Sequence, residues 1–173
     1  MTGRFAAVPP TVGPTSEVTL LALHTAITIG AQVARTAARL WGMPHLEHVA
    51  EQVAAHLIAR AVKTTGHPDP HPRYSEIDPA ALAVVGVRVH RRADALIIDV
   101  WDSDPTPPDS TPLDHHMSAV CGLARRWSSY PAPCGGKVVW AEIAAPRPHP
   151  AASQPSGNLL EDPTGTGCAC HAA

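Results

Sequence analysis

The stretch that decides the fold is Ala95–Asp102, which reads Ala-Leu-Ile-Ile-Asp-Val-Trp-Asp. Successive side chains of a strand point to opposite faces of a sheet, so Leu96, Ile98 and Val100 share one apolar face, and Asp102 falls on that face too. A carboxylate on the covered side of a sheet is costly unless a ligand, an ordered water or a backbone donor satisfies it. Two interpretations of Asp102 stay open: a small-molecule contact, or a turn of the kind that Asp often makes before Ser, Thr and Pro.

The segments around this strand predict an α+β protein. The fold class is a two-layer sandwich, in which a mixed, mostly antiparallel sheet carries helices on one face. Hydrophobic periodicity and turn residues predict strands at 17–23, 85–90, 95–102 and 137–143, and helices at 25–41, 46–64 and 115–127. The strands at 85–90 and 95–102 form one hairpin, and residues 128–130 lead through a Gly135-Gly136 turn into a second.

The chain divides into one domain and two tails. Residues 1–16, with several prolines, read as a flexible lead, and residues 17–144 form the domain. Residues 145–173 are rich in Pro, Gly and Ala, and are predicted to be disordered.

Composition excludes several classes of protein. A formal net charge of -2 gives no basic face for nucleic acid, and no run of apolar residues is long enough to cross a membrane. The N-terminus lacks the apolar segment of a signal peptide, so we expect a cytoplasmic protein with reduced thiols. Cys168 and Cys170 are too close together for the usual zinc spacing, and no metal site is predicted.

Separated pieces of the chain together resemble one family. The pieces are Ala38–Pro44 (ARLWGMP), the helix at 46–64, Leu96–Asp102, Gly122–Trp127 (GLARRW) and Gly135–Glu142 (GGKVVWAE). In this order and spacing, over about residues 17–144, they resemble the anti-sigma-factor serine kinase branch of the GHKL ATPases, the superfamily of gyrase B and histidine kinases. The resemblance implies a nucleotide pocket between the helices and the sheet, with ATP and Mg²⁺ as cofactors.

The resemblance implies roles for two residues at strand ends. In the family, an Asp at the place of Asp102 accepts a hydrogen bond from the adenine amino group. Lys137, at the entrance of the last strand, is also expected to lie at the nucleotide site, although Val138 follows it where many relatives have Thr.

The phosphate and metal end of the site departs from the family pattern. The Glu-x-x-x-Asn of the long helix is replaced by His56 and Arg60. Arg60 cannot ligate Mg²⁺ but can contact phosphate, and His56 is a candidate general base. Asp114 and His116 stand where the family has the glycines of its phosphate-binding Gly-x-Gly-Leu, so phosphate binding by backbone amides is hindered. Alternatively, His56 and Arg60 are simply polar side chains at the margin of a helix.

Two functional hypotheses therefore remain. The first is an ATP-binding regulatory domain resembling anti-sigma-factor serine/threonine kinases, which binds a regulatory protein in a nucleotide-linked way. The second is a non-catalytic, pseudokinase-like interaction module with weak or no nucleotide binding. The resemblance implies a sigma factor or an anti-anti-sigma-type protein as partner, and a homodimer as one expected assembly.

Overall fold

The computed structural model describes residues 13–67, 72–73, 78, 82–108 and 114–145. The predicted tail, with Cys168 and Cys170, and most of the predicted lead lie outside these residues. The elements are β1 (Thr15–Leu21), α1 (Thr25–Leu40), the 3-10 turn η1 (Pro44–Leu46), α2 (Glu47–Thr65), β2 (Val84–Arg92), β3 (Ala95–Asp102), α3 (His115–Leu123), β4 (Arg126–Pro131) and β5 (Lys137–Ala144).

The strands form one sheet in the order β1-β2-β3-β5-β4, and every neighbouring pair is antiparallel. The prediction of a mixed sheet is therefore wrong for the described strands. The connections explain the difference. Two helices between β1 and β2 return the chain to the end of the sheet that it left, so β2 runs back along β1. The single helix α3 makes β4 parallel to β3, but β5 lies between these two strands.

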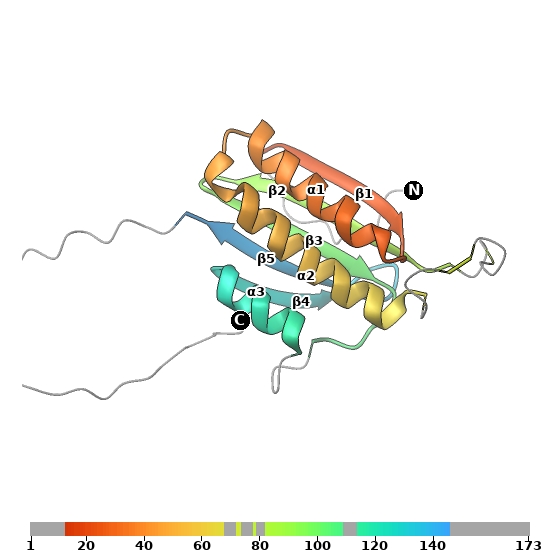
Figure 1. Ribbon diagram of the computed structural model, residues 1–173. Helices are drawn as coiled ribbons and strands as arrows, with labels where there is room; N and C mark the ends of the chain where they lie inside the picture. The colour runs from red at the N-terminus through yellow and green to blue at the C-terminus, as the bar shows by residue number, and fades with distance from the viewer. Residues whose placement is uncertain (1–12, 68–71, 74–77, 79–81, 109–113, 146–173) are drawn as a thin grey trace, which may run out of the picture.

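The helices form a layer on one face of the sheet (Figure 1), as predicted. α2 lies in the middle and contacts both α1 and α3. The core is formed where Leu96 and Ile98 of β3 meet Val53, Leu57 and Ile58 of α2, all at most 2% exposed. Burying a side chain of this size contributes about 1.5–3 kcal/mol, so this contact stabilises the packing of the helix layer on the sheet. The α+β two-layer architecture is thus confirmed.

Helix α1 packs closely on α2 because its inner face is made of small residues. A Cβ atom at Gly30 would collide with the end of the Ile58 side chain, which would have to shift. Glycine is a poor helix former, and yet Gly30 lies inside α1. Tertiary packing outweighs this local preference.

The predicted helix at 115–127 is too long. α3 ends at Leu123, and residues 126–131 form β4. The backbone N–H of Arg125 donates to the carbonyl of Glu142, which begins the pairing with β5. Trp127 still packs against the main core, but from a strand. Its spacing from Val120 and Leu123 fits a helix as well, so periodicity alone could not place this boundary.

Two further predictions can be compared with the described residues. Cys121 and Cys134 are thiols, as expected. Within the part of the chain that the structure describes, no helix has the length and apolar character needed to cross a membrane.

Candidate functional site

The six residues selected from the sequence fall into two groups. Asp102 and Lys137 meet where β3 ends and β5 begins, directly opposite each other in the β3–β5 register. The other four lie between α2 and α3: His56 and Arg60 on α2, and Asp114 and His116 at the start of α3. The helices and the sheet thus place each group on the covered side, as the predicted pocket requires.

Asp102 is bound by Lys137. Lys137 Nζ donates to Asp102 Oδ1 at 2.8 Å, and to the carbonyl and the Oδ2 of Asp104, both at 2.9 Å. An ammonium group has three donors, so all of them are used. Both Asp102 and Lys137 are only 1% exposed. The buried partner of this carboxylate was not among the donors considered from the sequence, because Lys137 was expected only at the strand entrance.

The turn interpretation of Asp102 is confirmed. Asp102 Oδ1 also accepts from the backbone N–H of Asp104 at 3.0 Å, which is an Asx turn. The predicted glycine turn before Lys137 is confirmed too, with positive φ at Gly135 (88°) and Gly136 (74°). A Cβ at Gly136 would collide with the carbonyl oxygen of Asp102. The two turns therefore lock together and hold Lys137 against Asp102.

The pKa values of the two acids around Lys137 shift in opposite directions. Burial raises the pKa of Asp102, against the hydrogen bond and the positive charge of Lys137. Burial acts in the same direction on Asp104, but the hydrogen bonds from Lys137 and Thr106 and the charge of Lys137 outweigh it and lower the pKa of Asp104 to about 2. The hydrogen bonds of Asp102 both end on Oδ1, which leaves Oδ2 for another donor.

The start of α3 is capped by a carboxylate. Asp114 Oδ1 accepts from the backbone N–H of Met117 at 2.9 Å, and Oδ2 accepts from Arg60 Nε at 2.9 Å. Burial disfavours the charged form of Asp114, but these hydrogen bonds and the charge of Arg60 lower its pKa. The N-terminus of a helix attracts anions. Here the carboxylate of Asp114 occupies that position itself.

His56 and His116 form a pair next to this cap. Their Nδ1 atoms lie 3.3 Å apart, so one donates and the other accepts. Burial lowers the pKa of His116, and the nearby His115, His56 and Lys63 lower it further against Asp114. The lowered pKa keeps the His116 imidazole neutral at pH 7, and the Nδ1 of His56 is already engaged with it. Among the described residues, no group of three His, Cys, Asp or Glu is placed to hold a metal ion.

One donor of this group stays without a partner. Arg60 Nη1 is buried and forms no hydrogen bond with the described residues. A buried unpaired donor is costly, and it marks the one point in the group where an added acceptor would be favourable.

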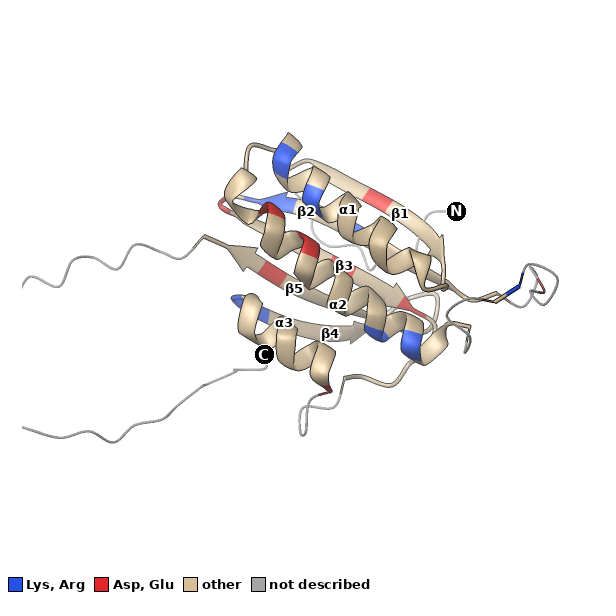
Figure 2. Cartoon of the chain, in the orientation of Figure 1, with Lys and Arg blue, Asp and Glu red and all other residues tan. Residues whose placement is uncertain are grey.

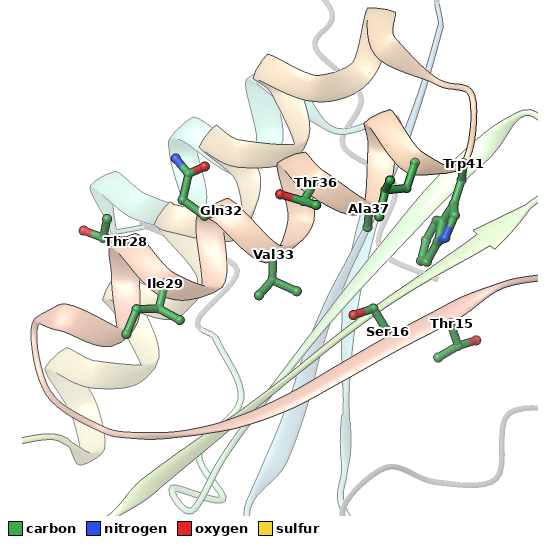
Figure 3. A pocket seen from close by; sticks show the side chains of 10 residues that line it. Thr15, Ser16, Thr28, Ile29, Gln32, Val33, Thr36, Ala37 and Trp41 are labelled. Atoms are coloured by element: carbon green, nitrogen blue, oxygen red, sulfur yellow. The ribbon is translucent and has the colours of Figure 1, made fainter.

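A groove runs along the opposite end of the helix layer, between α1 and the edge strand β1 (Figure 3). Its volume is about 670 Å³. Five of its ten lining residues are apolar, and among these Ile29 is 49% and Leu40 75% exposed; the other five are Thr, Ser or Gln. None of its lining residues is charged, and the first half of α1 has no charged residue (Figure 2). Exposed apolar side chains of this size, gathered beside a strand edge, are typical of an interaction surface.

Sequence reasoning missed two features of the sheet. Asp104 was assigned only to the turn, although it binds Lys137. Asp99, on the other face of β3, is 2% exposed and accepts from Arg88 Nε at 2.7 Å. The predicted hairpin contained the signal for this second pair, because its register places Arg88 opposite Asp99.

In comparisons with known proteins, the chain matches no family model and no curated protein. The resemblance to anti-sigma-factor kinases therefore depends on the sequence pieces alone, and what it implies about activity stays a prediction.

Proposed function

We propose that this chain is a non-catalytic regulatory domain, resembling anti-sigma-factor kinases, that acts by binding a protein partner. The observation that carries the proposal is the internal pairing of the candidate nucleotide residues. Lys137 binds Asp102, Arg60 binds Asp114, and His56 binds His116. Each residue that would contact a nucleotide is held by a neighbour in the same chain.

These pairings remove specific requirements of phosphoryl transfer. Transfer needs a cation that neutralises the phosphates and a group that orients the attacking nucleophile. Asp114 adds a carboxylate at the helix end where phosphate would bind, and Arg60 offers no acceptor for Mg²⁺. His56 shares its Nδ1 with His116. These replacements act on separate requirements and all disfavour catalysis.

The groove between α1 and β1 is the proposed partner surface. In the described part of the chain, β1 pairs with β2 alone, so its outer edge is open to a further strand. A partner segment in extended conformation can pair with this edge and place apolar side chains against Ile29 and Leu40. By resemblance, the partner is a sigma factor or an anti-anti-sigma-type protein.

The absence of catalysis can be tested by titrating the protein with ATP and ADP, each with and without Mg²⁺, and by measuring ATP turnover. We expect no turnover, and no binding that depends on Mg²⁺. Turnover that requires Mg²⁺ would refute the proposal.

The partner surface can be tested with a matched pair of substitutions. Ile29→Asp places a charge in the groove, whereas Leu21→Asp changes a residue of nearly equal exposure, 48% against 49%, outside the groove. Sigma factors and anti-anti-sigma proteins from the source organism would be tested pairwise by surface plasmon resonance. We expect one to bind, with at least tenfold weaker binding in Ile29→Asp only. Equal losses in both variants would exclude the groove.

A second candidate function, nucleotide-linked regulation, is favoured by one observation. Arg60 Nη1 is a buried donor without a partner, and Asp102 Oδ2 can still accept a hydrogen bond. An adenine nucleotide bound without metal would satisfy both. In that case binding would be independent of Mg²⁺, and would be lost in Asp102→Asn and weakened in Arg60→Gln.

A further inference from the structure

The sheet face opposite the helices, here called the uncovered face, is unusually buried. No described helix lies on it, and yet Ile97 and Trp101 are each only 7% exposed and Asp99 is 2% exposed. An antiparallel sheet with one open face normally alternates apolar and polar residues. Here long side chains from the neighbouring strands, including Arg88 and Tyr130, surround the middle of β3 instead.

The buried carboxylates on the uncovered face are paired with arginines. Arg88 and Asp99 form a buried ion pair, with Arg88 Nε 2.7 Å from Asp99 Oδ2. Glu142 of β5 is 5% exposed and accepts from Arg125 and from Arg126, with Arg126 Nη2 at 2.6 Å. Both carboxylates are thus neutralised by arginine.

Two polar atoms beside these pairs are left without partners. His90 is 3% exposed, and its Nδ1 lies 3.6 Å from Asp99 Oδ2, too far for a hydrogen bond. The hydroxyl of Tyr130 is also buried, and although it lies close to Arg88 it forms no hydrogen bond of good geometry with the described residues. Each unsatisfied buried group costs about 1–3 kcal/mol, so a ligand that satisfies both would bind favourably.

Both groups are neutral at pH 7. Burial lowers the pKa of His90, in spite of Asp99, and the positive charges of Arg88 and Arg92 act in the same direction as burial. Burial and the charge of Asp99 raise the pKa of Tyr130, although Arg88 opposes part of this rise. A neutral imidazole and a neutral phenol can each donate or accept, and they suit a ligand hydroxyl or ring nitrogen rather than a second charge.

His90 and Tyr130 are among the residues that line a cavity of about 150 Å³. A cavity of about this volume in a protein holds one benzene ring. Its walls include Ile97 and the ring of Trp140, over which the Arg126 guanidinium lies 5.6 Å from the ring centroid. The size and the aromatic wall favour a single planar ring.

The charge at the rim favours an anion. Arg92 lines the cavity, is exposed, and forms no ion pair with the described residues. Asp99 and Arg126, the other charged lining residues, are each paired with a residue of opposite charge. Arg92 therefore remains as the cation that a ligand carboxylate can reach.

We propose that this cavity binds a monocyclic aromatic carboxylic acid, with the ring against Trp140, the carboxylate at Arg92, and a ring hydroxyl at Tyr130 and His90. The site lies on the sheet face away from the helices. It is therefore independent of the proposed partner groove and of the candidate nucleotide residues.

The test is isothermal titration of the full chain with 4-hydroxybenzoate, benzoate and phenol, with the indole resonance of Trp140 as a reporter of the site. We expect 4-hydroxybenzoate to bind best, and to shift this resonance. Benzoate loses the hydroxyl contact and phenol loses the carboxylate contact, so each should bind about tenfold more weakly.

Two variants separate the contacts. Arg92→Gln should weaken the binding of 4-hydroxybenzoate about tenfold and leave the binding of phenol unchanged. The control is Arg91→Gln, a neighbouring residue whose side chain donates to the carbonyl of Trp41, and it should change the binding of neither compound. Tyr130→Phe should abolish the difference between 4-hydroxybenzoate and benzoate. Absence of binding by all three compounds at millimolar concentration would overturn the proposal. So would equal binding by the wild type, Arg92→Gln and Tyr130→Phe.

Discussion

Strand β3 holds two buried carboxylates that face opposite sides of the sheet. Asp102, on the side covered by helices, lies against an ammonium whose three donors are all used. Asp99, on the uncovered face, is paired with Arg88, but the atoms around this pair are not all satisfied. The Lys137 ammonium is thus fully bonded on one side, whereas buried atoms around Asp99 lack hydrogen-bond partners on the other. A fully bonded cation indicates a structural role, whereas unpaired buried atoms beside a cavity indicate a ligand site.

The largest effect is expected at Lys137. Lys137→Met leaves Asp102 buried without its cation, and removal of one partner of a buried ion pair costs about 3–5 kcal/mol. Urea denaturation would measure the free energy of unfolding. The exposed Lys63→Met is the matched control and should change it by less than about 0.5 kcal/mol. A loss below about 1 kcal/mol in Lys137→Met would contradict the structural role.

A smaller loss of stability is expected from a substitution on the uncovered face. Asp99→Asn removes the charge that faces Arg88 but keeps an acceptor, and Arg88 makes further interactions. We therefore expect Asp99→Asn to lower the free energy of unfolding by about 2 kcal/mol, which is less than the loss expected for Lys137→Met. A larger loss in Asp99→Asn than in Lys137→Met, in the same denaturation experiment, would reverse the comparison between the two faces.

Stability should also fall on mild acidification, through one histidine on each side of the sheet. The folded-state pKa values of His90 and His116 are lowered, mainly by burial, so the unfolded chain takes up these protons first as the pH falls. Their contribution to stability is complete above about pH 6.5, and is lost as the pH falls from there through the folded pKa values.

Thermal melts between pH 7.5 and 5 would measure this loss. His116→Asn should remove the part of this pH-dependent loss of stability that arises between α2 and α3. His90→Asn should remove the part that arises on the uncovered face. A melting temperature of the wild type that rises over this range on acidification would contradict the prediction.

The smallest effect is expected at Tyr130. Its hydroxyl has no partner among the described residues, so Tyr130→Phe removes a buried unsatisfied group and keeps the ring. We expect an unchanged or slightly higher free energy of unfolding, by up to about 1 kcal/mol. Destabilisation by more than this amount would show that the hydroxyl is bonded in the ligand-free protein, and would weaken the proposed aromatic-acid site.

Most elements could be predicted because their patterns are local. The alternation of Val85, Val87 and Val89 and the run at 95–102 are sufficient for a hairpin, and the apolar spacing over 46–64 predicts α2 within one residue at each end. The residues around Trp127 could not be assigned, since their spacing fits a helix while their backbone pairs with β5. Pairing with a distant strand is not visible in a local pattern.

The candidate site also divides into features that the sequence determines and features that depend on the tertiary structure. The parity of β3 places Asp102 on the covered face, and residue chemistry shows that Arg60 cannot replace a metal ligand; the sequence by itself determined both points. That Lys137 satisfies Asp102, that Asp114 caps α3, and that His90 and Tyr130 border a cavity were decided only by the tertiary structure. The reason is that β5 inserts between β3 and β4, and α3 packs on α2, so partners far apart in the chain meet. Side-chain direction follows from the local backbone, whereas the partner of a side chain depends on which distant elements pack beside it.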